Sequence, residues 1–238
     1  MFKRVLIHEL KNITRDKMYI FFVFFSLLMI LVGFFLIPYL RDTNSDMVAD
    51  IVTTVFILMN GFLYGAVTGF TLLDDQDDNV LLSLKISPIK VKHYVLIKLA
   101  LSYIFGLITT ILLVLTTGFL GTSSVIDLVF IVLLAPMQAP ILALLVNSFA
   151  SNKVEGFVIM KLSGIILITP IAALFISNWT ELFLGILPGF WPVRIISMQM
   201  MPTEFFLNST FLYFILGVVV NLVFLIFFFK LYTKRVNI

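Results

Sequence analysis

Residues Leu72–Lys98 read LLDDQDDNVLLSLKISPIKVKHYVLIK, and this is the longest polar stretch in a chain that is otherwise strongly apolar. Its charged residues are four aspartates followed by four lysines: Asp74, Asp75, Asp77, Asp78, Lys85, Lys90, Lys92 and Lys98. Between the two groups, Val80, Leu81 and Leu84 have the spacing of one face of a short helix. The stretch predicts an acidic turn, a short amphipathic helix and a basic run.

The end of this short helix is set by a proline. Pro88 cannot continue a helix, and steric contact with its ring pushes Ser87 out of helical geometry. A helix of about two turns is marginal on its own, so it needs a surface to dock against. The alternative interpretation is a solvated loop that only joins two membrane spans.

The composition places the chain in a membrane. Of its 238 residues 61% are hydrophobic and 12% are charged, and the mean hydropathy is +1.13. Soluble domains are about half apolar and a quarter charged. We therefore expect an all-α integral membrane protein, a single transmembrane domain over residues 1–238, with six spans of about 20 residues each. The expected spans are 19–39, 48–72, 95–119, 125–149, 157–176 and 211–229.

Two further segments do not fit a span. Residues 1–17 are amphipathic, with apolar side chains on one face and cations elsewhere, which predicts an N-terminal helix in the membrane interface. The alternative is a basic segment that only sets orientation. In residues 180–201 the apolar runs are too short to cross a bilayer, and Pro188, Gly189 and Pro192 break them. We expect this segment to form a re-entrant helical element between spans five and six.

Lysine and arginine set the orientation. Fourteen of the 16 fall at the N-terminus, in residues 72–98, around residues 151–161 and in the C-terminal tail. Only Arg41 and Arg194 fall on the other side. By the positive-inside rule, both termini and residues 74–92 face the cytoplasm of a multi-pass protein in the bacterial plasma membrane. A net charge of +3 reflects this bias and does not indicate a nucleic-acid partner.

The second span carries two adjacent stripes. Gly61, Gly65 and Gly69 recur every four residues, a pattern that lets a neighbouring helix approach closely. Asn60, Tyr64 and Thr68 form the next stripe, about 100° around the helix. The first stripe predicts helix packing. The second is either a lining of a transport pathway or a further set of helix contacts.

The 72–98 stretch resembles the first cytoplasmic loop of the type-2 ATP-binding-cassette (ABC) exporter permeases. The resemblance is carried by Leu81 and Leu84 in a leucine-rich turn, then Ser87-Pro88, Tyr94 and Lys98. The chain departs from that pattern at Asn79-Val80, where the family has Gly-Thr, and at Asp75-Gln76, where it has Glu-Arg. Membership would make 74–92 a coupling loop whose short helix rests in a cleft of an ATPase subunit. The implied ATPase-coupling residues are Asp75, Asp78, Val80, Leu81, Leu84, Ser87 and Pro88.

The resemblance also implies a function. The chain would be the transmembrane subunit of an ATP-driven exporter, moving an amphipathic small molecule, drug, peptide or lipid outward by alternating access. Two ABC ATPase subunits would bind the ATP and magnesium, so no cofactor is expected here. A second permease would complete a homodimer or heterodimer surrounded by membrane lipid. Spans two and five would line the pathway, which suggests Asn60, Tyr64, Thr68, Met160, Ser163 and Thr169.

Other chemistry finds little support in the sequence. There is no phosphate-binding loop, no cysteine and no His, Asp or Glu cluster with metal-ligand spacing, so neither catalysis nor a metal site is expected. His8 and His93 are far apart. No carboxylate falls in the middle of a span, whereas ion-driven carriers usually need one there. An ATPase-independent channel or secondary carrier remains the main alternative, and a lipid-modifying membrane enzyme is a weaker one.

Overall fold

The computed structural model describes residues 6–7, 10–11, 14–43, 46–86, 90–118, 124–176, 178–200 and 205–237. Within these ranges every regular element is a helix and there is no strand, which confirms the expected fold class. In the described part of the chain, six helices or joined helices are long and apolar enough to cross a membrane. They are α2 (Lys17–Thr43), α3 (Asp46–Asp77), α5 (Val91–Thr116), α6 with η2 and α7 (Val125–Phe149), α8 with η3 (Lys153–Phe175) and α11 (Thr210–Arg235).

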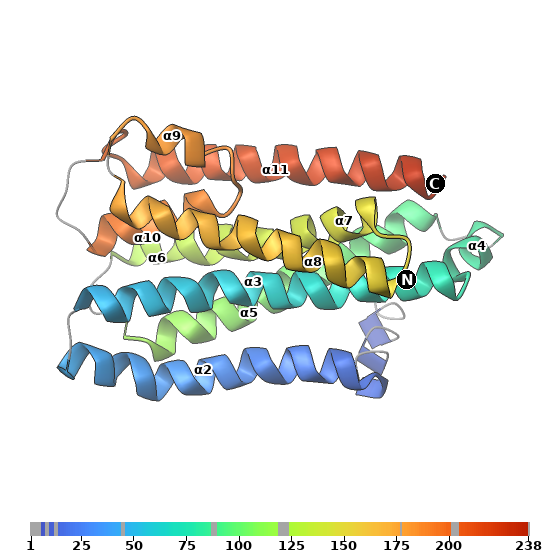
Figure 1. Ribbon diagram of the computed structural model, residues 1–238, viewed down its shortest axis with the longest axis horizontal. Coiled ribbons are helices and arrows are strands. Elements are labelled where there is room, and N and C mark those ends of the chain that lie inside the picture. Colours follow the sequence, from blue (N-terminus) through green and yellow to red (C-terminus); the bar gives the residue numbers. More distant parts are fainter. Residues whose placement is uncertain are drawn as a thin grey trace.

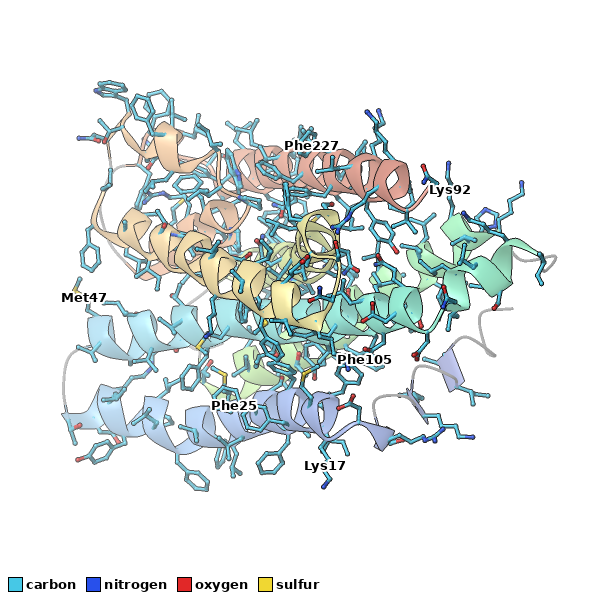
Figure 2. All side chains as sticks on the ribbon, turned by 45° about the vertical axis from the view of Figure 1, so that its right-hand side comes forward. Lys17, Phe25, Met47, Lys92, Phe105 and Phe227 are labelled. Atoms are coloured by element: carbon cyan, nitrogen blue, oxygen red, sulfur yellow. The ribbon has the colours of Figure 1, made fainter. Side chains whose placement is uncertain are left out.

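The spans lie side by side along the long axis of the molecule (Figure 1). A short helix, α4 (Val80–Lys85), lies at one end, while α9 (Glu181–Leu184) and α10 (Phe190–Met200) lie at the other. In both α3 and the fourth span 67% of the most apolar window is buried, against 22% in α11 and 28% in α2. The second and fourth spans therefore form the centre, and side chains such as Phe227 of α11 project outward (Figure 2).

Glycines allow the two central helices to meet. A Cβ atom on Gly65 would lie 2.7 Å from the backbone oxygen of Ala139, which is closer than atoms can approach. A Cβ atom on Gly61 would lie 3.1 Å from Gln138 Cβ, and one on Gly69 would lie 3.5 Å from Ala143 Cα. All three glycines of the predicted packing stripe thus face the fourth span, because the absence of side chains lets the backbones approach.

The fourth span is broken near its middle, where the sequence has two prolines. It consists of α6 (Val125–Leu134), a 3₁₀ turn η2 (Ala135–Met137) and α7 (Gln138–Phe149). Pro136 lacks the backbone N–H that a regular helix would need, so the turn tightens there. At this break the Gln138 amide reaches another span: its Nε2 donates to Asn221 Oδ1 of α11 at 2.9 Å.

The second span is longer than the sequence suggested. α3 continues past Leu72 to Asp77, so Asp74, Asp75 and Asp77 lie on its last turns and not in a loop. The turn to α4 follows at Asn79, whose φ of 57° lies in the left-handed region. Asparagine tolerates that conformation better than most residues, which explains how it can stand where the resembling family has glycine.

Some expected features fall outside the described part of the chain. Ser87 and Pro88 of the expected coupling loop lie outside the described residues. Of the expected interfacial helix, only residues 6–7, 10–11 and 14–17 are described.

The opposite end of the bundle contains a fully buried ion pair. Arg194 of α10 and Glu181 of α9 are both 0% exposed, and Arg194 Nη2 lies 2.7 Å from Glu181 Oε2. The Tyr213 hydroxyl of α11 also donates to Glu181, and Arg194 donates to the Ile176 carbonyl. Burial lowers the pKa of the Arg194 guanidinium, and the charge of Glu181 opposes that shift. The pair joins α9 to α10, and the Tyr213–Glu181 hydrogen bond ties this segment between spans five and six to α11.

Candidate functional site

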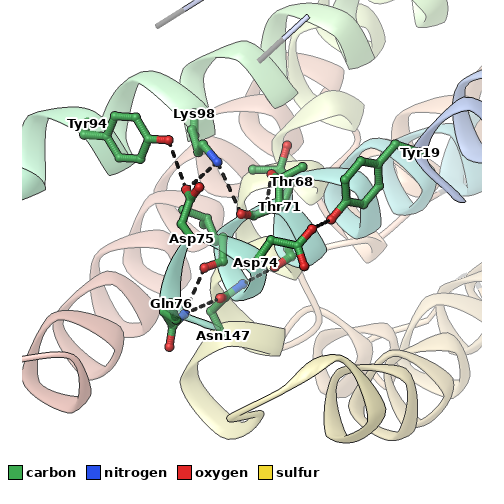
Figure 3. Close-up of polar contacts among 11 residues, drawn as sticks. Tyr19, Thr68, Thr71, Asp74, Asp75, Gln76, Tyr94, Lys98 and Asn147 are labelled. Carbon is green, nitrogen blue, oxygen red and sulfur yellow. Dashed lines mark hydrogen bonds and ion pairs between the residues drawn. The ribbon is translucent and has the colours of Figure 1, made fainter. Parts of the chain in front are cut away.

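The last turn of α3 carries a polar cluster at the α4 end of the bundle, and the buried Asp75 lies at its centre. Asp75 is 3% exposed and Lys98 of α5 is 1% exposed, with Lys98 Nζ 2.5 Å from Asp75 Oδ2. The Tyr94 hydroxyl donates to the same carboxylate oxygen at 3.0 Å (Figure 3). Lys98 also donates to the Thr71 carbonyl at 3.3 Å. The second and third spans are thus joined through one buried ion pair.

The neighbouring Asp74 points to other helices. The Tyr19 hydroxyl of α2 donates to Asp74, and Lys153 Nζ of α8 lies 2.8 Å from Asp74 Oδ1 (Figure 3 shows Tyr19 and Asp74). Lys153 is also 3.5 Å from Asp16 Oδ2. Carboxylates at the C-terminal end of a helix meet the negative end of its dipole. The cations of α5 and α8 offset that repulsion, so these acids can lie on the helix.

Gln76 completes the cluster on a third side. Its Nε2 donates to Asn147 Oδ1 of α7 at 2.8 Å, and Asn147 Nδ2 donates to the Gly69 carbonyl at 2.8 Å. Arg235 at the end of α11 donates to the Asn147 carbonyl at 3.0 Å. Three consecutive residues of α3 therefore bind three different sets of neighbours. This helix end therefore contacts spans one, three, four and five.

The helix α4 lies directly beyond this cluster, with its apolar side chains divided between two directions. Leu81 is 2% exposed and packs in a core with Leu72, Tyr94 and Tyr232. Leu82 is 57% exposed and Ile86 is 92% exposed.

The sequence-based docking face is therefore partly turned inward. Leu81 is inside, Val80 and Leu84 are half-buried, and Asp78 is exposed. Sequence reasoning missed Leu82 and Ile86, although their spacing of four residues was a signal that they share a face.

Two of the candidate pathway residues of span two line one cavity. Tyr64 and Thr68 face a space of about 110 Å³ between α2, α3 and α5, which Lys98, Ser102 and Phe105 also line. Asn60 has a different place, because its amide is enclosed by hydrogen bonds. It accepts from Ser26 Oγ of α2 at 2.7 Å and donates to Thr109 of α5. Asn60 thus bridges the first three spans.

The candidate pathway residues of span five lie elsewhere. Ser163 is 3% exposed and lines a second cavity of about 150 Å³ whose lining includes none of the three residues from span two. Met160 is half-buried beside the core that contains Leu63 and Phe70, and Thr169 begins η3. Within one chain, the structure does not bring the two sets of candidates together.

The cluster at the end of α3 consists of carboxylates held by donors from neighbouring helices. Among the described residues, no group of three or more His, Cys, Asp or Glu side chains could hold a metal ion. Tyrosine hydroxyls and lysine ammonium groups donate to the carboxylates of Asp74 and Asp75. The arrangement joins the end of α3 to its neighbouring spans through ion pairs and hydrogen bonds.

Comparison with known proteins identifies relatives. The profile of a family described as "Fluoroquinolones export permease protein Rv2686c-like" matches residues 9–229. Two curated proteins of Mycobacterium tuberculosis, fluoroquinolones export permease protein Rv2686c of strain H37Rv and its counterpart MT2760 of strain CDC 1551, are each 28% identical over 161 residues. The match covers 65% of this chain and 63% of each relative, so it spans less than two thirds of their length. No solved structure matches the chain.

Proposed function

The chain belongs to the Rv2686c-like family of fluoroquinolones export permease proteins, and from this premise we propose that it is the membrane subunit of an ATP-driven ABC exporter. The observation that carries the proposal is the family match over residues 9–229, which includes all six candidate spans up to the last turns of α11. The sequence contains no phosphate-binding loop, so ATP and magnesium would be bound by a separate ATPase.

The coupling mechanism uses the α4 end of the bundle. Leu82 and Ile86 would enter a cleft of the ATPase, because they are the exposed apolar side chains of this helix and its last turn. Closure of two ATPases on ATP would move α4. Leu81 would pass that movement into the core that contains Tyr94, and the Asp75–Lys98 pair would pass it to α5. The spans would then rock as rigid bodies between inward-open and outward-open states.

The assembly would contain two permeases, identical or homologous, and two ABC ATPases in a bacterial plasma membrane. Both termini and α4 would be cytoplasmic, as the distribution of lysine and arginine indicates. The transported compounds would be amphipathic and aromatic, with fluoroquinolones as the first class to examine because of the relatives' names. Peptides and lipids remain candidates of similar amphipathic character.

A channel or secondary carrier that works without an ATPase is the alternative. The structure contains buried acids, but Asp75 and Glu181 are each paired with a cation and lie near the ends of the bundle. A carrier driven by protons needs a carboxylate that can load and release a proton along the pathway.

The test is co-purification followed by transport. The chain is expressed with each ABC ATPase of its own genome, extracted in detergent and purified by a tag on the permease. We expect one ATPase to co-purify and the pair to lower intracellular fluoroquinolone in a drug-sensitive host. Efflux by the permease alone, unaffected by an ATPase unable to hydrolyse ATP, would favour the carrier.

A further inference from the structure

A notch of about 230 Å³ opens beside α4, and we call it the basic notch. It is lined by Gln76, Leu81, Leu82, Lys85, Ser151, Arg235 and Val236. These residues come from the end of α3, from α4, from the turn between α7 and α8, and from the end of α11. Four segments that are distant in sequence therefore form one recess at the α4 end of the bundle.

Two cations line the basic notch, and the contacts that the described residues make with them come from neutral acceptors. Lys85 Nζ donates to the Asn237 carbonyl at 3.1 Å. Arg235 donates to the Asn147 carbonyl and to Ser151 Oγ. Among the described residues, neither cation takes part in an ion pair. Glu155, the acid on the first turn of α8, accepts from the Ser151 backbone N–H at 2.7 Å. The notch thus carries positive charge that the described part of the chain does not neutralise.

The notch borders the apolar side chains that are exposed on α4. Leu82 is one of its lining residues, and Ile86 follows Lys85 at the end of the helix. An exposed apolar side chain beside two cations is complementary to a partner surface that has an apolar groove next to an acidic side chain. Hydrogen bonds between arginine or lysine and a carboxylate are about twice as strong as those between neutral groups.

We propose that the basic notch receives an aspartate or glutamate side chain of the ATPase partner while Leu82 and Ile86 occupy the apolar groove beside that acid. This inference rests on the proposed function. The notch connects α4 with the end of α11, so one acidic side chain would engage the second-to-third-span connection and the sixth span together. Movement of the ATPase would then reach α11 without passing through the membrane core.

The first experiment measures binding of the co-purifying ATPase to full-length permease variants in detergent. Lys85→Glu should weaken the complex about tenfold or more, because a like charge would face the acid. Lys92→Glu is the matched control, since Lys92 is exposed at the same end of the bundle and lies outside the notch (Figure 2). Equal weakening by the two variants would contradict the proposal, because it would reflect the overall charge of this face.

The second experiment identifies the partner group. A zero-length carbodiimide joins an amine to a carboxylate only where the two are in contact, and the product is mapped by mass spectrometry. We expect a link between Lys85 and an acid of the ATPase, and its loss in Lys85→Arg, which keeps the charge and still binds. A link from Lys85 to a carboxylate of its own chain in the intact complex would overturn the proposal. If no ATPase binds wild-type permease, the proposed function fails first, and the notch proposal fails with it.

Discussion

Lys98 Nζ lies 2.5 Å from Asp75 Oδ2, and both side chains are almost completely buried between α3 and α5. The pair lies close to α4. Tyr94 donates to the same Asp75 carboxylate and packs in one core with Leu81 of α4. The position of α4 is thus linked to the second and third spans, because this contact would have to break before either span could move without the other.

Removing one member of this pair should destabilise the protein strongly. Lys98→Met leaves a buried carboxylate without its cation, which typically costs about 3–5 kcal/mol. The double variant Asp75→Asn with Lys98→Met removes both charges and should recover most of that loss. Thermal unfolding of purified protein, followed by size-exclusion chromatography, measures both. Equal unfolding temperatures for the single variant and the wild type would refute the structural role.

Some apolar side chains of α4 are exposed and one is buried in the core, so substitutions at the two kinds of position can be compared. Leu82→Asp and Ile86→Asp alter exposed side chains, so folding should be unaffected while ATPase binding and efflux are lost. Leu81→Asp places a charge in the core with Tyr232 and should reduce folded protein instead. Yield after detergent extraction and drug efflux are measured for each variant. Normal efflux by the double variant Leu82→Asp, Ile86→Asp would argue against docking through this surface.

The glycine stripe can be tested by adding one methyl group at a time. Gly65→Ala would bring Cβ to 2.7 Å from a backbone oxygen of Ala139, so the two central helices must separate. We expect a loss of about 1–3 kcal/mol, the usual cost of overpacking. Gly69→Ala is the control, because its Cβ would have an ordinary contact at 3.5 Å. If the two variants unfold at the same temperature, the close contact is not needed for stability.

Within the second stripe, we expect Asn60 to stabilise the fold and Tyr64 to affect which compounds are exported. Asn60→Leu removes the buried amide that bonds Ser26 and Thr109 and should lower the amount of folded protein. Tyr64→Ala enlarges the cavity that Thr68 also lines, so it should change which compounds are exported while expression stays normal. Export profiles against a panel of amphipathic drugs test this. An unchanged profile for Tyr64→Ala would mean that this cavity is packing and not pathway.

Single cysteines can test the orientation, because the chain has none of its own. Cysteines at Asp77 and Asn237 should be protected in intact cells from an impermeant thiol reagent. A cysteine at Asn178, which is exposed between η3 and α9, should react. The opposite labelling pattern would invert the proposed topology.

The six spans were predictable because long apolar runs leave few other folds open to the backbone. The direction of individual side chains was less predictable. A helix that is apolar on nearly every face has no periodic signal to show which face is buried. In the short helix the cause is different: apolar residues stand at 80, 81, 82, 84 and 86 and fit more than one face, so Leu81 was expected to be presented, whereas the structure exposes Leu82 and Ile86.

Pairings between distant residues could not be predicted from spacing. Arg194 was counted as a charge of the outer side, yet it is fully buried against Glu181. Lys98 matched a family position, but nothing in the sequence identified Asp75 as its partner. Such contacts depend on how helices pack, which is decided by shape across the whole bundle and not by a local pattern.

The central claim is that ATP drives transport through this permease, and transport into inside-out membrane vesicles tests it most directly. Vesicles that contain the permease and its co-purifying ATPase are given a fluorescent fluoroquinolone, with the proton gradient abolished by an uncoupler. The account predicts accumulation that requires ATP hydrolysis and disappears with Leu82→Asp, Ile86→Asp. Accumulation that needs the proton gradient and continues without ATP would contradict it.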